Sequence, residues 1–260
     1  MRDKDELIRH VEEDKKIYAR SILDKIDKVL FKNICVYTNF LDPYEISIAE
    51  SILNRFEDLK YEVIGGYEGA ERNVLVIYPS FFCALENKDV VAIEIKGDFK
   101  FNKISHRNYM GSILNLGISK EVIGDIIIHE NYGQIIIKED IKEFIIDNLK
   151  KIGRETISVK EISLSDIEIP AEKYEIINMN VTSMRLDAFV ASLLKTSRSE
   201  AIKYIDNDKI KVNFKLINKK TYTLKEEDLL SIRGHGRFVI TSNIRKTKKD
   251  RLFIEVKRKI

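Results

Sequence analysis

The sequence lacks the features of a membrane protein and of a structural metal site. No stretch approaches the roughly 18 to 20 consecutive apolar residues that a membrane span needs. Only two cysteines occur, Cys35 and Cys83, and neither belongs to a CxxC motif or to a Cys/His cluster with metal-ligand spacing. We interpret both as buried apolar side chains. Residues 1–16 are mostly charged, unlike a signal peptide, so we expect a soluble cytoplasmic protein with no membrane partner.

Motifs for nucleotide binding and for catalysis are also missing. The glycine-rich segment 65–69 lacks the GKS or GKT ending of a phosphate-binding loop and contains an acidic residue, so it predicts a plain turn. His10, His129 and His235 have no partners at ligand spacing, so we expect ordinary structural roles for them. No paired catalytic carboxylates stand out. The sequence therefore predicts no catalytic residue, no metal and no cofactor.

Positive charge is concentrated in the last third of the chain. Residues 182–260 contain 20 Lys and Arg against 9 Asp and Glu, whereas residues 1–181 contain 25 against 33. The formal net charge of +3 thus hides a basic segment behind an acidic one. A basic segment suits a polyanion, because each Lys or Arg that neutralises a phosphate also releases a condensed counterion. This asymmetry predicts nucleic acid as the partner.

The spacing of apolar residues predicts an α+β fold with three domains and a linker. Residues 1–79 alternate helical and strand-like segments, as expected of an N-terminal α/β domain, in which Asp42 can cap a helix whose first position is Pro43. Residues 80–165 show the order βαββαβ, typical of ferredoxin-like domains and of modules that bind single-stranded RNA, although the aromatic pair of those modules is not evident. The polar segment 166–181 is expected to be the linker. Residues 182–260 are expected to form a small C-terminal domain with a basic tail.

The C-terminal domain contains most of the candidate RNA contacts. We expect two helices, the second opening at Ser197 with a capping box completed by Glu200. Lys211 and Lys215 are expected on a sheet face shared with this helix. In segment 233–237, two glycines would let the backbone approach a phosphate between two guanidinium groups. The predicted RNA-binding residues are Arg185, Lys195, Arg198, Ser199, Lys203, Lys211, Asn213, Lys215, Arg233 and Arg237.

Two further segments leave two interpretations open. His106 and Arg107 begin a helix in the middle domain, where free amides of the first turn favour a phosphate contact; a local helix cap is the alternative. The tail from residue 245 to 259 is either a solvated basic extension or, because of its apolar residues from Leu252 to Val256, a packed strand.

The motifs of the C-terminal domain resemble the S-four (S4) domain, a small RNA-binding module named after a small-subunit ribosomal protein. The matching stretches are Arg185-Leu186-Asp187, Ser197-Arg198-Ser199 with Ala201, Ile210-Lys211-Val212-Asn213, and Asp228 followed by Ile232-Arg233-Gly234. Members of the family usually have Gly where this chain has Asp208 and Phe214. Asp tolerates a left-handed turn, whereas Phe214 is expected to require a turn of another shape.

Motifs along the whole chain resemble the YlmH family of bacterial ribosome-associated proteins. They are Phe40-Leu41-Asp42-Pro43, His106-Arg107-Asn108-Tyr109-Met110-Gly111, Leu116-Gly117-Ile118, Ile123-Gly124-Asp125-Ile126 and Arg233-Gly234-His235-Gly236-Arg237-Phe238. The resemblance implies a non-enzymatic factor of ribosome-associated quality control. It would bind ribosomal RNA of obstructed large ribosomal subunits that carry peptidyl-tRNA, and assist a tailing factor in adding alanine to the stalled chain. We expect a monomer.

The principal alternative is an RNA-modifying or tRNA-charging enzyme with an appended S4 domain. Asp187, within Arg-Leu-Asp, resembles the nucleophile of pseudouridine synthases. It is expected on a helix of the binding module itself, where a capping and positioning role is simpler, and the preceding segment shows no catalytic signature. A protein-only adaptor is a third possibility, which predicts ribosome association that is insensitive to salt.

Overall fold

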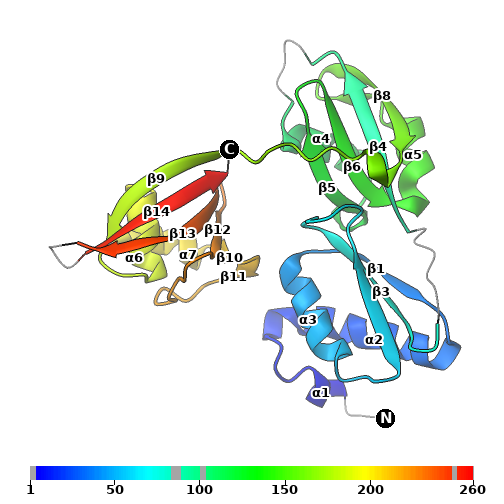
Figure 1. The fold of residues 1–260 in the computed structure, drawn as a ribbon, viewed down its shortest axis with the longest axis horizontal. Coiled ribbons are helices and arrows are strands. Elements are labelled where there is room, and N and C mark those ends of the chain that lie inside the picture. Colours follow the sequence, from blue (N-terminus) through cyan, green and yellow to red (C-terminus); the bar gives the residue numbers. More distant parts are fainter. Residues whose placement is uncertain (1–3, 83–88, 100–103, 248–250, 260) are drawn as a thin grey trace. The chain divides into compact units, whose positions relative to one another are not determined.

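The chain forms two compact units, Met1–Pro170 and Ala171–Ile260 (Figure 1). Each unit combines helices with antiparallel strands, which confirms the predicted α+β class. The computed structural model describes residues 4–82, 89–99, 104–247 and 251–259. Cys83 lies outside the described residues, whereas Cys35 is a half-buried free thiol.

The first unit begins with a three-stranded antiparallel sheet of order β1-β3-β2 and the helices that pack on it. Its elements are α1 (Lys4–Leu7), η1 (Glu13–Lys15), α2 (Lys16–Lys32), β1 (Val36–Leu41), α3 (Pro43–Leu53), β2 (Leu59–Ile64) and β3 (Asn73–Pro79). Helix α3 starts as predicted: Asp42 Oδ1 accepts the Glu45 N–H at 2.9 Å, and Glu45 Oε2 accepts the Asp42 N–H at 3.1 Å. This capping box, with Pro43 in first position, fixes the helix start.

The middle of the chain has the ferredoxin-like arrangement predicted from its order of elements. It comprises β4 (Val90–Gly97), α4 (His106–Leu114), η2 (Lys120–Val122), β5 (Ile123–Ile128), β6 (Tyr132–Lys138), η3 (Glu139–Ile141), α5 (Lys142–Asn148), β7 (Lys151–Ile152), β8 (Glu155–Ile162) and η4 (Leu164–Asp166). The sheet order is β5-β6-β4-β8-β7, with antiparallel pairing throughout. Ile93 and Ile95 of β4 are fully buried in the core that includes Tyr109 and Ile113 of α4 and Ile145 of α5.

The opposite face of this five-stranded sheet is also covered. Ala92 and Ile136 point away from α4 and α5 and form a buried cluster with Phe40 and Val74 of the first sheet. The two sheets therefore share a core within one compact unit. The boundary proposed between residues 79 and 80 stays a prediction.

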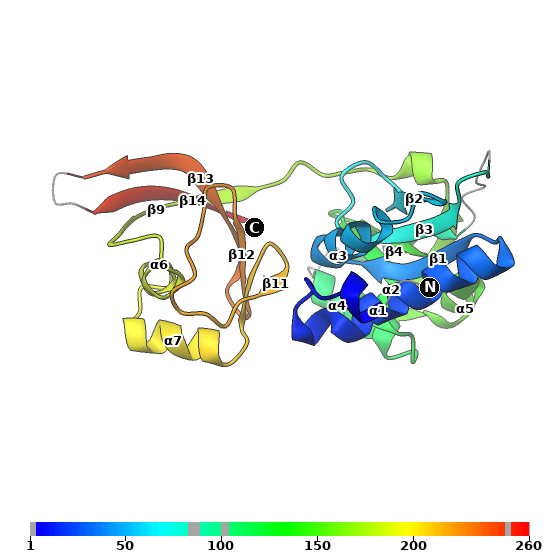
Figure 2. The ribbon, with the colours of Figure 1, turned by 90° about the horizontal axis from the view of Figure 1, so that it is seen from below.

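The second unit is a six-stranded antiparallel sheet of order β11-β10-β12-β13-β14-β9 with α6 and α7 on one side (Figure 2). Its elements are β9 (Tyr174–Val181), α6 (Leu186–Leu193), α7 (Arg198–Asp206), β10 (Ile210–Val212), β11 (Lys215–Leu216), β12 (Leu229–Ile232), β13 (Gly236–Lys246) and β14 (Leu252–Lys259). Phe189 of α6 and Ala201 of α7 are fully buried with Ile210, Leu230 and Ile240 of the sheet.

The predicted linker 166–181 is wrong over its second half, because this half contains strand β9. Strand β9 pairs with β14 from Tyr174 opposite Lys259 to Val181 opposite Leu252. It is an edge strand with an open outer face, so most of its residues are exposed and the segment looks polar in sequence. In the described part of the tail, residues 245 and 246 end β13 and residues 252–259 form the packed strand β14, in which Ile254 is fully buried, so this part is not a solvated extension.

The turn at Phe214 also differs from expectation. Asn213 and Phe214 have φ of 49° and 66° and form the loop between the paired residues Val212 and Lys215. Positive φ at both positions is what a type I′ hairpin requires, so Phe214 adopts the left-handed turn that Gly normally provides. Its ring is contacted by the Arg237 guanidinium, 5.7 Å from the ring centroid.

Candidate nucleic-acid interface

A buried carboxylate holds two of the predicted RNA-binding arginines. Arg185 precedes the first turn of α6 and donates from Nε and Nη2 to the two oxygens of Asp187, at 3.2 and 3.0 Å. Arg198, the first residue of α7, donates from Nε and Nη2 to the same oxygens at 3.0 and 3.2 Å. The Ala188 N–H also donates to Asp187, at 2.8 Å. The helices α6 and α7 are thus joined at their N-terminal ends by one carboxylate.

Asp187 is only 3% exposed and is ionised in this environment. Burial by itself would raise the pKa of Asp187, but the hydrogen bonds from Arg198, Arg185 and the Ala188 amide hold that pKa below its ordinary value. A carboxylate enclosed in this way is not accessible to attack a nucleotide. The positioning role expected for Asp187 therefore agrees with its geometry, and the nucleophile of the enzyme alternative does not.

The two arginine side chains remain available on their outer sides. The side chains of Arg185 and Arg198 are 43% and 52% exposed, although both are anchored at Asp187. A guanidinium has more N–H donors than the ones used here, so each can still bind a phosphate oxygen. Because the carboxylate already restricts their rotamers, binding would order little more of either side chain. The arrangement suits a preorganised phosphate contact.

The other predicted residues near α7 differ in how much they are committed to the fold. Lys195 is exposed in the connection between α6 and α7, with φ of 52°. Ser199 is exposed in the first turn of α7. The capping box is half-formed: Ser197 Oγ accepts the Glu200 N–H at 3.1 Å, but Glu200 forms an ion pair with Lys203 at 2.8 Å. Lys203 is thus partly neutralised by its own helix.

Asn213 has a structural role that the sequence analysis missed. Its Nδ2 donates to Asp228 Oδ1 at 2.8 Å, its Oδ1 accepts the Leu229 N–H at 2.8 Å, and Asp228 Oδ2 accepts the Lys225 N–H at 2.7 Å. Both ends of the amide are therefore used to hold the β10–β11 turn against β12. These contacts give Asn213 a structural role, and its contact with RNA stays a prediction. The pair of Asn213 and Asp228 in the S4-like motif was the signal that could have indicated this role.

Lys211 does not share a face with α7, contrary to expectation. In β10, Ile210 and Val212 are buried with the helices, so Lys211 between them points to the opposite side of the sheet. Lys211 lies opposite Ser231, which in turn lies opposite Arg237, so Arg237 is on this outer face as well. Lys215 pairs with Val212 and lies toward the helix side. The predicted set is therefore divided between the two faces.

Arg233 lies in the turn between β12 and β13, which is tied to α7. Gly234 and Gly236 have φ of 90° and 101°, a conformation that favours glycine. His235 Nε2 and the Tyr204 hydroxyl of α7 are 3.0 Å apart, so this histidine has the structural role expected for it. The Arg233 side chain is exposed, and its backbone N–H donates to the Lys209 carbonyl at 2.9 Å. Tyr204, absent from the prediction, positions this turn.

In the first unit, His106 and Arg107 are exposed at the start of α4. Asn108 Oδ1 accepts hydrogen bonds from the Ser105 N–H at 2.9 Å and from Ser105 Oγ at 2.6 Å. Asn108, where Asp is commoner, thus provides the same acceptor for a local cap. Neither His106 nor Arg107 belongs to these two hydrogen bonds, and their contact with RNA remains a prediction.

The sheet face that RNA-binding modules of this topology use is covered in this protein. Gln134, in the middle of β6, is only 1% exposed. Its Nε2 donates to the Asp166 carbonyl at 3.0 Å and its Oε1 accepts the Glu168 N–H at 2.8 Å, so the segment after β8 crosses this face. The N-terminal sheet covers the rest through the shared cluster. RNA bound by this unit would have to use its helices or loops.

The motifs of the first unit hold its two sheets together. Asp125 accepts hydrogen bonds from the Tyr67 hydroxyl at 2.7 Å and from the N–H groups of Glu71 and Arg72 at 2.7 and 3.1 Å. A side chain on Gly124 would meet the Phe40 ring at 2.8 Å. The segment 65–69 is therefore more than the plain turn expected, because its Tyr67 anchors the glycine-rich loop to β5.

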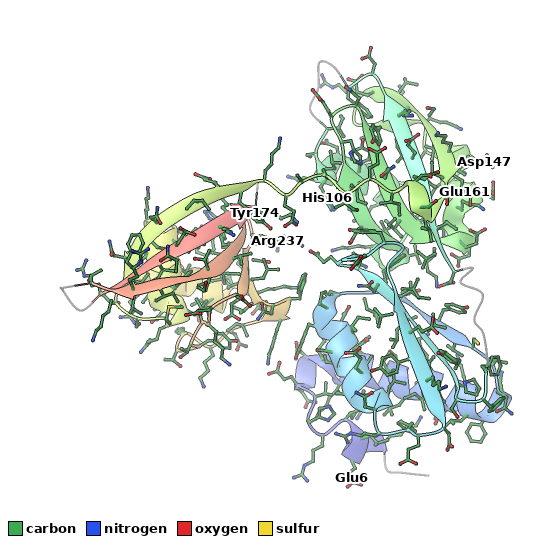
Figure 3. The ribbon with its side chains drawn as sticks, viewed as in Figure 1. Glu6, His106, Asp147, Glu161, Tyr174 and Arg237 are labelled. Atoms are coloured by element: carbon green, nitrogen blue, oxygen red, sulfur yellow. The ribbon has the colours of Figure 1, made fainter. Side chains whose placement is uncertain are left out.

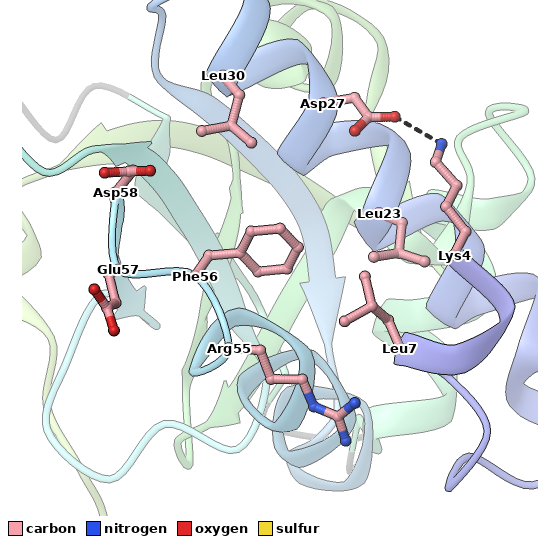
Figure 4. Close-up of a pocket in the computed structure, with 9 residues that line it drawn as sticks. All are labelled: Lys4, Leu7, Leu23, Asp27, Leu30, Arg55, Phe56, Glu57 and Asp58. Carbon is pink, nitrogen blue, oxygen red and sulfur yellow. Dashed lines mark ion pairs between the residues drawn. The ribbon is translucent and has the colours of Figure 1, made fainter. Parts of the chain in front are cut away.

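A surface cavity of about 380 Å³ lies between α1, α2 and the segment after α3 (Figure 4). Leu7, Leu23 and Phe56 line it together with Lys4 and Asp27, which form an ion pair at 2.7 Å. This mixture of apolar and paired charged groups provides no recognisable catalytic set. Among the described residues no group of His, Cys, Asp or Glu could hold a metal ion. Over the same residues no helix is long and apolar enough to cross a bilayer.

Comparisons with known proteins agree along the chain. Three family models match: "YlmH, N-terminal" over residues 14–81, "Putative RNA-binding domain in YlmH" over residues 76–166, and "S4 domain" over residues 184–230. The chain is 32% identical over 247 residues to the ribosome-associated protein quality control protein P2 of Bacillus subtilis (strain 168), covering 95% of this chain and 96% of that protein. The solved structure of the cell division protein ylmH from Streptococcus pneumoniae is similar in fold, with a TM-score of 0.54 and 24% identity, covering 62% of this chain and 98% of that one.

Proposed function

The chain belongs to the YlmH family, and from this premise we propose that it is a cytoplasmic, ribosome-associated RNA-binding factor without catalytic activity of its own. Its S4 domain supports RNA as the partner, and the name of the Bacillus subtilis relative supports a ribosomal setting. In finer detail, the factor would bind the large ribosomal subunit together with peptidyl-tRNA. There it would assist a tailing factor that adds alanine to the stalled chain.

The observation that carries the proposal is the pair of arginines held by Asp187. Arg185 and Arg198 present guanidinium groups whose positions are fixed by a buried carboxylate and whose outer sides are exposed. Fixed guanidinium groups suit the phosphates of a structured RNA, whose narrow major groove excludes side chains. Lys195 and Ser199 adjoin this pair in sequence and would extend the contact, and Arg233 would add a further cation. His106 and Arg107 of the first unit would form a second contact, with transfer RNA or a neighbouring ribosomal element.

Gradient sedimentation of cell extracts tests the proposal. Arg198→Ala should move most of the protein from the large-subunit fractions to the top of the gradient, since loss of a charge-assisted phosphate contact costs about 1 to 3 kcal/mol. Arg251→Ala is the matched control, because Arg251 is exposed in the same unit but lies outside the predicted RNA-binding set. Equal sedimentation of both variants would contradict the proposal. Arg198→Lys should be intermediate, since lysine keeps the charge but loses the paired donors.

Salt distinguishes an RNA contact from a protein-only contact. The logarithm of the affinity for an isolated RNA duplex should fall with the logarithm of the salt concentration, with a slope of about 0.9 per phosphate neutralised. Affinity that does not change with salt would favour the protein-only adaptor.

Two assays test the finer claims. Obstructed large subunits with peptidyl-tRNA, supplied with the tailing factor and alanyl-tRNA, should acquire alanine tails faster with the wild-type protein than with Arg198→Ala. Incubation with ribosomal and transfer RNA should produce no pseudouridine. Turnover that Asp187→Asn abolishes would instead favour the enzyme alternative.

A further inference from the structure

The outer face of the C-terminal sheet carries two adjacent rows of side chains that no helix or strand described in the second unit covers. Directly opposed residues of an antiparallel sheet lie on the same face, so the strand register defines each row. The first row crosses β11, β10, β12 and β13 through Leu216, Lys211, Ser231 and Arg237. The second crosses β12, β13, β14 and β9 through Leu229, Val239, Lys257 and Ile176. Arg237 and Val239 are two residues apart on β13, which places both rows on one face.

This face is open because α6 and α7 pack on the other side. The strands β9, β13 and β14 are drawn in front of these helices in Figure 1, and Figure 2 shows the helices on one side of the sheet only. Ile176 is 47% exposed, although it is an apolar residue in the middle of a strand. Leu216 is 36% exposed at the other edge of the sheet. Residues 184–230 match the S4 domain, so most of the second row lies outside the matched segment.

The charges of the two rows are all of one sign. Lys211, Arg237 and Lys257 are basic, and no acidic residue belongs to either row. Glu255, two positions before Lys257 on β14, lies on the same face beside the second row and accepts a hydrogen bond from Asn243 at 3.4 Å. Neither Lys211 nor Lys257 forms an ion pair with any residue that the structure describes. Lys257 instead lies over the ring of Tyr174, 5.8 Å from the centroid, and this tyrosine is 36% exposed on the same face (Figure 3). A face with cations between exposed apolar and aromatic groups complements a chain of phosphates whose bases need a stacking surface.

We propose that the outer face of this sheet is a second RNA-binding surface, which takes a single-stranded segment of RNA. The phosphates would lie along Lys211, Arg237 and Lys257, and a base would stack on Tyr174 next to Ile176. The sheet face would thus bind an unpaired strand, while the arginines at α6 and α7 bind structured RNA on the opposite side. The inference takes RNA as the ligand from the proposed function, but it stands on residues that the proposed contact does not use.

Binding of two RNA probes to the full-length protein tests the inference. The probes are a labelled 12-nucleotide oligouridine and a 12-base-pair RNA hairpin, titrated at several salt concentrations. Removing two charges with Lys211→Gln/Lys257→Gln should weaken oligouridine binding at least tenfold and lower its salt slope by about 1.4, from roughly 0.7 per phosphate on single strands. Hairpin binding should change less than twofold.

A matched double variant removes two charges elsewhere in the second unit. Lys219 and Lys220 are exposed lysines between β11 and β12 that lie outside the predicted RNA-binding set, and Lys220 forms an ion pair with Asp206 of α7. Lys219→Gln/Lys220→Gln should leave oligouridine binding within twofold of the wild type. An equal loss in both double variants would overturn the inference, because it would reflect net charge alone.

A second pair of variants tests stacking and does not depend on charge. Tyr174→Leu keeps an apolar side chain but removes the ring, and should weaken oligouridine binding at least fivefold. Tyr174→Phe keeps the ring and loses the hydroxyl hydrogen bond to Glu172, and should bind like the wild type. Unchanged binding by Tyr174→Leu would overturn the stacking contact.

The outcomes separate this inference from the proposed function. If Arg198→Ala reduces hairpin binding while the Lys211 and Lys257 variant leaves oligouridine binding intact, the inference fails and the proposed function stands. If wild-type protein binds neither probe but still sediments with ribosomes, RNA is not the ligand of either face and both fail. A partner protein that binds the sheet face in place of RNA would leave oligouridine binding undetectable while hairpin binding persists, which also overturns the inference.

Discussion

The sheet of the middle region and the sheet of the C-terminal unit differ in how their faces are covered. The five-stranded sheet has helices on one face and the N-terminal sheet on the other, and the segment after β8 covers Gln134. The six-stranded sheet has helices on one face only, and Ile176 is left 47% exposed on the other. The topology typical of RNA-binding modules therefore belongs to the five-stranded sheet, which is covered on both faces. Coverage by neighbouring elements, and not topology, decides which sheet face remains accessible to a ligand.

Motif residues in the two regions differ in the same way. In the first unit, Phe40, Gly124 and Asp125 all contribute to packing between the two sheets. In the second unit, Asp187 has a similar anchoring role, but it holds Arg185 and Arg198 with their outer sides exposed. A buried motif carboxylate can therefore have either of two roles. It stabilises an internal interface when its main hydrogen-bond donors are backbone N–H groups, and it positions a binding group when its donors are exposed arginine side chains.

The largest change in the free energy of unfolding is expected at the interface between the two sheets of the first unit. Asp125→Ala leaves the amides of Glu71 and Arg72 and the Tyr67 hydroxyl without their acceptor, which should lower the free energy of unfolding by about 3 kcal/mol. Denaturant unfolding followed by circular dichroism measures it. Asp147→Ala, on the exposed side of α5 (Figure 3), should change that free energy by less than about 0.5 kcal/mol. Similar values for the two variants would show that the sheets are not held together at Asp125.

Asp187, which holds the two arginines of the second unit, should have the next largest effect on the free energy of unfolding, and this effect should depend on pH. Asp187→Asn should lower the free energy of unfolding at neutral pH by about 2 kcal/mol, because two charge-assisted contacts weaken. The pKa of Asp187 is lower in the folded state than its ordinary 3.8, so the unfolded chain binds the proton more readily. The carboxylate's contribution is therefore complete well above pH 3.8 and is lost as the pH falls through the folded-state value.

Unfolding of the wild type and of Asp187→Asn between pH 7 and pH 2 measures this dependence. The difference between the two proteins should shrink toward the acid end. A difference that is constant over this range would show that the carboxylate's charge contributes nothing to the anchor.

A smaller loss of unfolding free energy is expected at Asn213, a motif residue with a structural role in the second unit. Asn213→Ala removes hydrogen bonds to Asp228 and to the Leu229 N–H, and should cost about 1 to 2 kcal/mol of unfolding free energy. Asn218→Ala, at an exposed position of the same unit, is the matched control. RNA affinity of the folded Asn213→Ala protein should stay within about threefold of the wild type. A larger loss of affinity would support Asn213 as a direct contact with RNA.

The smallest change in stability is expected at Phe214, which follows Asn213 in the same turn. Phe214→Gly relieves the cost of a left-handed backbone, about 1 kcal/mol, but loses the contact between its ring and Arg237, worth about 0.5 to 1 kcal/mol. The unfolding midpoint in denaturant should therefore move little. A clear stabilisation would show that the ring contact contributes nothing.

Local sequence patterns predicted most of the helices and strands and a nucleic-acid partner. Local patterns were sufficient for the start of α3 at Pro43, the βαββαβ order and the basic last third, because capping, apolar spacing and charge are properties of neighbouring residues. Edges were harder to predict: β9 looked like a linker because an edge strand with an open face buries few of its side chains.

The roles of the motif side chains depend on contacts that form only in the folded protein. The structural role of Asn213 was missed because Asp228, which accepts a hydrogen bond from its amide, lies 15 residues later in the chain, just before β12. Lys211 was placed with α7 until the packing of Ile210 and Val212 turned it to the other face. Whether a polar group meets solvent or a partner depends on chain segments distant in sequence, whose approach is driven by burial of the shared core and leaves no local pattern.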